Sequence, residues 1–369
     1  MNMPAGLKTT LTAAAYALFC GTASAWRLIP GMAEQPPAEN FFPIGIYGVL
    51  SPDSVPLLKE AGFNTIQTYT QAPDKIAALA TACRKNGMKL VSSPYRVMGS
   101  PYAKEARKTW PILAWYLYDE PEVHSLTPPE LFLKYMEVKN WSQNQRTVFV
   151  TGEGKCAVAY GKSADALMVD WYPVPHLPLE SAGRQIDTAL KGLGIINQPL
   201  KPVWAVLQAF NWLYYPQHSR NRIGRYPTAA ELRFMTYHSV LSGAKGVFYF
   251  TFTNSSTGLP LTEYPELWHN LSKTVKEIAG LRKVLESGTE TECPAACAGP
   301  LACRAWKYDG KTYLVAANTA NTHTVMPKAL RDDRKWTVLF ERSAKIEDLT
   351  EERRHPRFSP YRVFVLRSR

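Results

Sequence analysis

Two adjacent carboxylates, Asp119 and Glu120, are the residues of this sequence whose types and position best suit chemistry. They end an apolar run, residues 112–117, that is typical of a buried strand, and Pro121 terminates that strand. Burying two adjacent carboxylates in a hydrophobic core is energetically costly. Strand ends at the C-terminal rim of a parallel barrel, in contrast, carry catalytic groups. We therefore predict an active site at this strand end, with Glu120 as its proton donor.

The segments around the acidic pair alternate between strand-like and helix-like patterns at barrel spacing. Strands are expected at residues 41–49, 64–69, 88–94, 112–117, 146–151, 166–172, 202–209 and 247–252. Capping boxes at Thr127–Glu130 and Thr228–Glu231 begin two of the intervening helices, and a long helix from residue 265 to about residue 286 ends the series. Because no Gly-rich phosphate loop follows the first strand, a closed barrel is favoured over a doubly wound sheet.

The composition changes after residue 288, where short β-rich segments replace the alternating pattern. Residues 302–308 and 312–318 flank an Asp309-Gly310 hairpin turn, and residues 336–341 and 361–366 continue the pattern. The predicted fold is an α/β chain with a (β/α)8 TIM barrel at residues 41–288. A small C-terminal all-β, sandwich-like domain is expected at residues 289–369.

Three cysteines, Cys293, Cys297 and Cys303, lie within a short Pro- and Gly-containing stretch. In an exported protein this spacing indicates a local disulfide with one thiol left over. A zinc site is less favoured because no histidine lies at a usual spacing nearby. Cys83 and Cys156 are expected to be small buried hydrophobes.

The N-terminus has the pattern of a secretory signal: Lys8, an apolar stretch at 11–19, and Ala23-Ser24-Ala25 as the cleavage site. We expect a signal peptide at 1–25, a linker at 26–40, and export to the periplasm, the cell surface or the medium. No other segment is long and apolar enough for stable membrane insertion.

The formal net charge of +12 favours acidic partners such as an anionic polysaccharide. No helix-turn-helix, zinc-finger or RNA-binding signature indicates nucleic acid. The seven histidines are scattered, no Gly-x-Ser-x-Gly elbow is present, and no metal or other cofactor is expected. The sequence does not determine the oligomeric state.

The layout resembles the retaining glycoside hydrolase superfamily of (β/α)8 barrels, and in particular its beta-galactosidase-like members. In that superfamily the fourth strand ends in Asn-Glu-Pro, which corresponds here to Asp119, Glu120 and Pro121. Residues 231–247 and the closing segment 359–366 are also similar. Together with the N-terminal signal, the resemblance implies a secreted glycoside hydrolase that cleaves a poly- or oligosaccharide with Glu120 as general acid/base. It also implies a nucleophilic Glu at the end of strand seven, where this chain has Gln208.

Three accounts of the chemistry remain open because an amide cannot replace that nucleophile. Asp170, on the sixth strand, is one candidate partner of Glu120, with Glu153 in reserve. In the second account Asp119 and Glu120 are both catalytic, which is similar to exo-acting hexosaminidases whose substrate supplies its own acetamido nucleophile. That account requires a bulge or strand end that lets adjacent residues converge. In the third, the barrel is a non-catalytic carbohydrate-binding or scaffolding protein.

Several further residues near predicted strand ends could contact a sugar or the acidic pair. Arg96 could form a buried salt bridge with the pair, which is the structural alternative to catalysis, or keep Asp119 ionised. Residues that could stack on or hydrogen-bond a sugar are Tyr47, Gln67, Tyr69, Trp171, Tyr172, Gln208, Trp212 and Tyr249.

Overall fold

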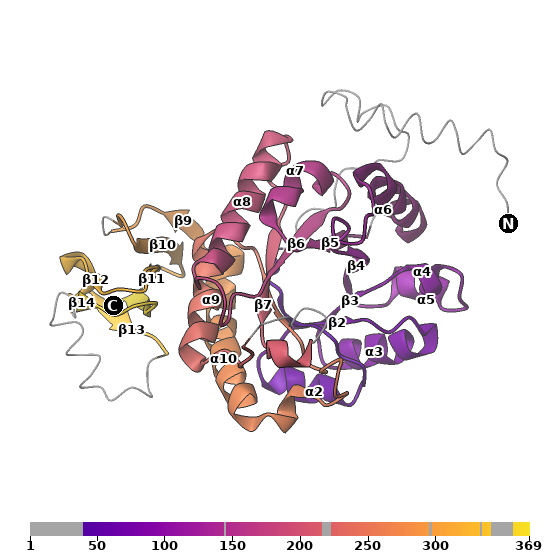
Figure 1. The fold of residues 1–369 in the computed structure, drawn as a ribbon, viewed down its shortest axis with the longest axis horizontal. Helices are drawn as coiled ribbons and strands as arrows, with labels where there is room; N and C mark the ends of the chain where they lie inside the picture. Colours follow the sequence, from indigo (N-terminus) through magenta and orange to yellow (C-terminus); the bar gives the residue numbers. More distant parts are fainter. Residues whose placement is uncertain (1–39, 144, 216–222, 295–296, 333, 341–356) are drawn as a thin grey trace.

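The computed structural model describes residues 40–143, 145–215, 223–294, 297–332, 334–340 and 357–369. The predicted signal peptide and all but the last residue of the predicted linker lie outside this range. Eight parallel strands close into a barrel in chain order, which confirms the predicted fold class (Figure 1). They are β1 (Ile44–Ile46), β2 (Thr65–Thr68), β3 (Lys89–Ser92), β4 (Ile112–Asp119), β5 (Thr147–Thr151), β6 (Ala166–Trp171), β7 (Val203–Gln208) and β8 (Val247–Phe250).

Helices surround the barrel, and two of them begin at the predicted capping boxes. They are α2 (Ser54–Glu60), α3 (Pro73–Lys85), α4 (Tyr95–Met98), α5 (Ala103–Lys108), α6 (Pro128–Ser142), α7 (Ala157–Tyr160), α8 (Ser181–Ile195), α9 (Ala229–Leu241) and α10 (Pro265–Ser287). Both predicted capping boxes form: Glu130 accepts the Thr127 backbone N–H at 2.8 Å, and Glu231 accepts that of Thr228 at 2.8 Å. None of the described helices is long and apolar enough to cross a membrane.

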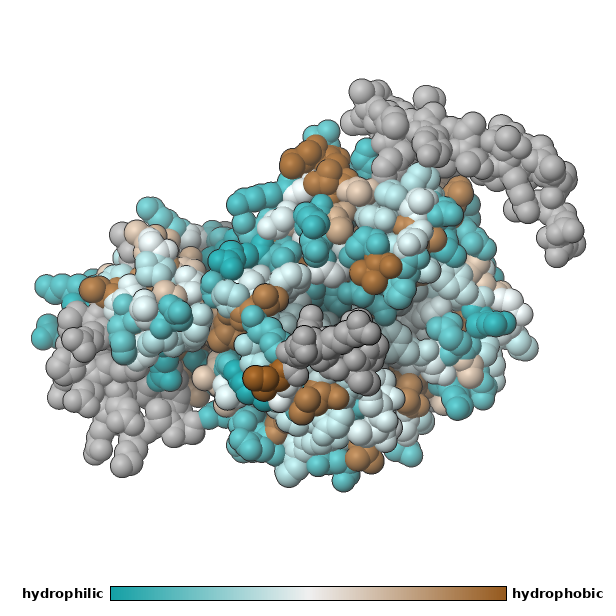
Figure 2. All heavy atoms as spheres, viewed as in Figure 1, coloured by the Kyte–Doolittle hydropathy of each residue, from teal (hydrophilic) through white to brown (hydrophobic). Residues whose placement is uncertain are grey.

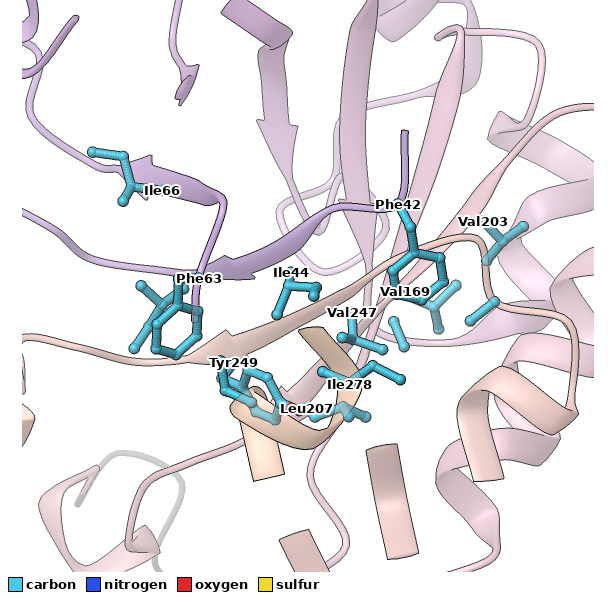
Figure 3. Packing of buried hydrophobic residues seen from close by; sticks show 14 of the residues in the cluster. Phe42, Ile44, Phe63, Ile66, Val169, Val203, Leu207, Val247, Tyr249 and Ile278 are labelled. Atoms are coloured by element: carbon cyan, nitrogen blue, oxygen red, sulfur yellow. The ribbon is translucent and has the colours of Figure 1, made fainter. Parts of the chain in front are cut away.

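The strands divide their side chains between two apolar layers, since successive residues of a strand point to opposite faces. Inside the barrel lie Tyr47, Val91, Tyr116, Val148, Val150, Met168, Trp204, Val206 and Phe248. The outer layer packs the strands against the helices, and Figure 3 shows Leu207, Val247 and Tyr249 gathered near Ile278 of α10. The inward position of β1 is Gly45, where a Cβ atom would lie 2.2 Å from the Phe248 ring.

The C-terminal strands form a five-stranded antiparallel sheet with the order β13-β15-β11-β10-β9 and a two-stranded sheet. Their bounds are β9 (Thr289–Thr291), β10 (Leu301–Tyr308), β11 (Lys311–Asn318), β12 (Thr324–Val325), β13 (Trp336–Val338), β14 (Arg357–Phe358) and β15 (Val363–Ser368). One face of the larger sheet, including Trp306 and Val365, belongs to the same buried cluster as the barrel helices, beside α9 and α10 (Figure 1). On the face in Figure 2, hydrophobic residues occur in separate small groups among hydrophilic ones.

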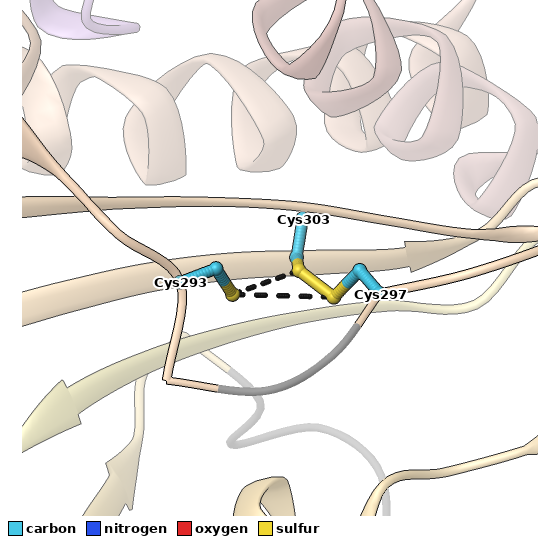
Figure 4. The surroundings of a disulfide bond; sticks show 3 residues. All are labelled: Cys293, Cys297 and Cys303. Carbon is cyan, nitrogen blue, oxygen red and sulfur yellow. Dashed lines mark hydrogen bonds between the residues drawn. A yellow bond between two sulfur atoms is a disulfide. The ribbon is translucent and has the colours of Figure 1, made fainter.

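The predicted local disulfide joins Cys297 to Cys303, and the Sγ atom of Cys293 lies 2.8 Å from that of Cys303 (Figure 4). Cys83 is buried in α3 as predicted, and burial raises the pKa of its thiol to about 12. Cys156 is only partly buried, in the 3-10 turn Gly154–Cys156.

Candidate active site

The end of β4 departs from regular strand geometry at the acidic pair. The register with β5 shifts between Tyr116, opposite Val148, and Asp119, opposite Val150, so that β4 carries one extra residue. Val148 and Val150 point into the barrel, and Asp119 therefore points inward as Tyr116 does. Glu120 follows with a φ of 41°, in the left-handed region, and its side chain also reaches the cavity. The bulge and the turn together satisfy the geometric condition for both carboxyl groups to converge.

Asp119 is held by two phenol groups. The hydroxyl of Tyr116 donates to Oδ1 at 2.8 Å, and that of Tyr69 donates to Oδ2 at 3.3 Å. Burial raises the pKa of Asp119, whereas the hydrogen bonds from Tyr116 and Tyr69 lower it. Because each of its oxygens accepts one of these bonds, the Asp119 carboxyl is fixed in orientation.

Glu120 is half-buried at the same cavity, and its surroundings favour the protonated form. Burial raises the pKa of its carboxyl group, and the negative charges of Asp119 and Glu122 raise it further. A raised pKa is the property that a carboxylic acid needs to donate a proton near neutral pH. The environment of Glu120 therefore suits a general acid.

Asp170 approaches from β6, whose register places it opposite Val206, a residue of the inner layer. Its side chain lines the cavity, the residue is only 9% exposed, and its Oδ1 atom has no hydrogen-bond partner among the described residues. Burial raises the pKa of Asp170 well above its ordinary value, and the charges of Glu120 and Asp119 raise it further. Two neighbouring carboxylates repel each other, so one of the two groups tends to stay protonated. This arrangement therefore favours one proton on the Glu120–Asp170 pair.

Glu122 is a contributing residue that the sequence analysis missed. Its Oε1 atom accepts hydrogen bonds from Thr151 Oγ1 at 2.6 Å and from the Gly152 backbone N–H at 2.7 Å. These bonds fasten the segment after β4 to the end of β5. Glu153, the reserve candidate, does not line the cavity; its exposed side chain pairs with Lys155. No sequence signal distinguishes the two, because tertiary contacts decide that Glu122 meets the end of β5 while Glu153 is exposed.

Aromatic side chains form most of the cavity wall. The cavity has a volume of about 500 Å³. Its lining residues are Tyr47, Tyr69, Asp119, Glu120, Val123, Val150, Asp170, Tyr172, Val206, Phe210, Trp212, Tyr215 and Phe250. Phe210 lies at the centre of the wall, with ring centroids 5.0 Å from Tyr172 and 4.9 Å from Trp212. Tyr47, Tyr69, Tyr172 and Trp212 were predicted as contacts; Phe210, Tyr215 and Phe250 were missed, although Phe210 and Phe250 continue the inward alternation of β7 and β8.

Gln208 has a structural role at the end of β7, where the resemblance leads one to expect a nucleophile. Its side chain accepts the Val174 N–H at 2.8 Å, donates to the Val174 carbonyl at 2.8 Å, and donates to the Phe210 carbonyl at 3.2 Å. Gln208 is fully buried and does not line the cavity. Its amide therefore connects the segment after β6 to β7 and is not presented to a ligand.

Four other predicted residues lie outside the cavity lining. Trp171 points outward and donates to Ser181 Oγ at 2.8 Å, and the hydroxyl of Tyr249 bonds Thr236 Oγ1 of α9 at 2.7 Å. Gln67 accepts the Gly48 N–H at 3.1 Å. Arg96 is exposed on α4, and no ion pair joins it to Asp119 among the described residues. A buried salt bridge with Arg96 thus does not account for the acidic pair.

Solved structures that share this fold include several glycoside hydrolases. No protein-family model and no curated protein matches the chain in sequence. A glycoside hydrolase family 5 structure from Bacteroides vulgatus matches with a TM-score of 0.57 at 13% identity, covering 89% of each chain. An alpha-amylase from Geobacillus thermoleovorans, complexed with acarbose, matches with a TM-score of 0.52 at 11% identity over 90% of this chain and 98% of its own.

A GH30 endoxylanase from Clostridium papyrosolvens has a TM-score of 0.52 at 10% identity, covering 89% of this chain and 96% of its own. At these identities the likeness shows the fold alone. The chain is thus a (β/α)8 barrel with a C-terminal β domain whose structural neighbours are glycoside hydrolases. The fold alone does not determine the chemistry, which depends on the residues of the cavity.

Proposed function

We propose that this protein is an exported glycoside hydrolase that cleaves glycosidic bonds of an oligo- or polysaccharide, with Glu120 as general acid/base. The observation that carries the proposal is the convergence of Asp119, Glu120 and Asp170 on one aromatic-walled cavity at the C-terminal end of the barrel strands. Rings provide flat apolar faces for sugar rings, while carboxyl groups supply the acid and the carboxylate that glycosidic cleavage needs.

Asp170 is the preferred partner of Glu120. Both oxygens of Asp119 accept hydrogen bonds from tyrosines, whereas Oδ1 of Asp170 has no partner among the described residues. Glu120 would protonate the leaving oxygen, and the Asp170 carboxylate would stabilise the oxocarbenium-like centre by attacking it or by activating a water molecule. Asp119 would then fix the sugar by a hydrogen bond and keep the proton on Glu120 through its negative charge. The substrate-assisted scheme, with Asp119 orienting an acetamido group, is the alternative assignment.

The first experiment is turnover on a broad glycan panel by the wild type, Glu120→Gln and Asp170→Asn. Loss of either carboxyl group should lower hydrolysis by about 10²-fold or more. Aryl glycosides with good leaving groups need little protonation, so Glu120→Gln should retain activity on them and Asp170→Asn should not. Asp119→Asn separates the two assignments, because only substrate assistance makes its loss as severe as that of Glu120. The matched control is Glu153→Gln, whose carboxylate is exposed and outside the cavity.

The non-catalytic account has one supporting observation, namely the amide of Gln208 at the end of β7. If the wild type and Glu120→Gln bind the same glycan equally and neither cleaves any member of the panel, the barrel is a carbohydrate-binding protein. In that case the acidic cluster is a recognition element.

A further inference from the structure

The charges of the cavity differ from those of the whole chain. The chain has a formal net charge of +12. The described residues that line the cavity nevertheless include three carboxyl groups and no Lys, Arg or His. Glu122 adds a fourth acidic residue close by, whose charge raises the pKa of Glu120, while the nearby His124, which does not line the cavity, acts in the opposite direction. An anionic sugar, which the overall charge favours, would therefore meet like charges in the cavity itself.

Asp170 provides a second observation, independent of the number of acidic groups. It is more than nine-tenths buried, faces the cavity, and leaves Oδ1 without a partner among the described residues. Hydrogen bonds with Tyr172 and Glu120 act on the same carboxyl group, but a buried carboxylate oxygen without a partner is costly unless a cation or a hydrogen-bond donor reaches it. The ligand should therefore supply a donor at this atom, preferably one that carries positive charge.

The spacing of the acids favours an organic cation over a metal ion. Among the described residues, the cavity carboxylates do not form a group of three whose ligand atoms lie close enough together to hold one metal ion. The walls around Asp170 are aromatic, with the Tyr172 and Phe250 rings 5.7 Å apart. Aromatic faces together with carboxylates recognise ammonium groups through cation–π and ionic attraction.

We propose that the sugar unit bound in this cavity carries a free, protonated amino group, as in a de-N-acetylated hexosamine, and that Asp170 Oδ1 accepts a hydrogen bond from that ammonium. This inference rests on the proposed function and specifies its substrate class. The ammonium would neutralise part of the charge of the acidic cluster, and the rings would cover the apolar face of the sugar.

The test is calorimetric binding of matched oligosaccharides to the full chain carrying Glu120→Gln, which slows turnover. Glucosamine and galactosamine oligomers are compared with their N-acetylated forms and with the corresponding neutral oligomers. The amino form should bind at least about tenfold tighter than both counterparts. Adding Asp170→Asn should abolish that preference, whereas adding Glu153→Gln should leave it intact. Thermal unfolding shows whether each variant is folded.

Equal or tighter binding of the neutral or N-acetylated oligomers would overturn the inference, as would an amino preference that survives Asp170→Asn. Hydrolysis by the wild type is recorded separately on the same oligomers. Cleavage without an amino preference refutes only this inference, and an amino preference without cleavage refutes only the proposed hydrolase. Failure to bind any of the oligomers counts against the inference.

Discussion

A Cβ atom on Gly152 would lie 2.8 Å from Oε1 of Glu120. Gly152 follows β5 directly, and its backbone N–H donates to Glu122. The lack of a side chain at position 152 therefore makes room for the Glu120 carboxyl group, while the backbone of the same residue holds the neighbouring acid. Two successive strand ends thus position the proton donor jointly.

Gly152→Ala should displace the Glu120 carboxyl group and lower kcat by about tenfold or more, because misplacing a catalytic group by a fraction of an ångström is costly. The free energy of unfolding should change little in comparison. Steady-state kinetics and thermal unfolding check both expectations. Gly99→Ala is the control, since a Cβ there meets nothing within 4 Å and its φ is −95°. Unchanged kcat in Gly152→Ala would contradict this account of the Glu120 position.

The pH dependence of hydrolysis should follow the raised pKa of Glu120. The proton donor works below that pKa, so kcat/KM should fall as pH rises through a value above the ordinary pKa of about 4.3 for Glu. Asp119→Asn removes the negative charge that helps to keep Glu120 protonated. The fall of kcat/KM at high pH, the alkaline limb of the profile, should therefore shift to lower pH. A profile of kcat/KM against pH for both proteins checks the shift, and an unmoved limb would contradict the coupling.

Asp170→Asn should stabilise the fold, and more strongly at neutral pH than at low pH. The pKa of Asp170 is raised in the folded state. The unfolded chain therefore ionises at lower pH, and stability falls as pH rises from about 3.9 through the folded-state pKa. An amide avoids this loss because it does not ionise. Melting temperatures of wild type and variant at pH 4 and pH 7 measure the effect; a difference independent of pH would contradict it.

Arg233→Met should weaken the packing of the C-terminal domain on the barrel. Arg233 of α9 donates to Glu277 of α10 at 2.7 Å and to the Val363 carbonyl of β15 at 2.7 Å. Its loss removes the ion-pair partner of Glu277, which is 6% exposed and keeps a hydrogen bond from the Tyr237 hydroxyl at 3.4 Å; breaking a buried ion pair in this way costs about 3–5 kcal/mol. Chemical denaturation measures the cost. Lys191→Met, which breaks the exposed pair with Asp187, should cost at most about 0.5 kcal/mol.

Much of the architecture could be read from local patterns. The eight strands, the capping boxes at Thr127 and Thr228, and the local disulfide each depend on residues close together in sequence. The acidic pair was identified for the same reason, as carboxylates at the end of an apolar strand. Hydrophobic periodicity and helix capping act over a few residues, and the sequence displays them directly.

The tertiary structure decided which of the candidate residues share a cavity. Tyr172 points inward and Trp171 outward although they are adjacent, and Tyr249 faces α9 rather than the interior. A shift of one residue in strand register exchanges the two faces, and sequence alone does not fix where a strand bulges or how it aligns with its neighbours. The extra residue in β4 turns Asp119 inward, and only closure of the barrel brings Asp170 from β6 to meet it.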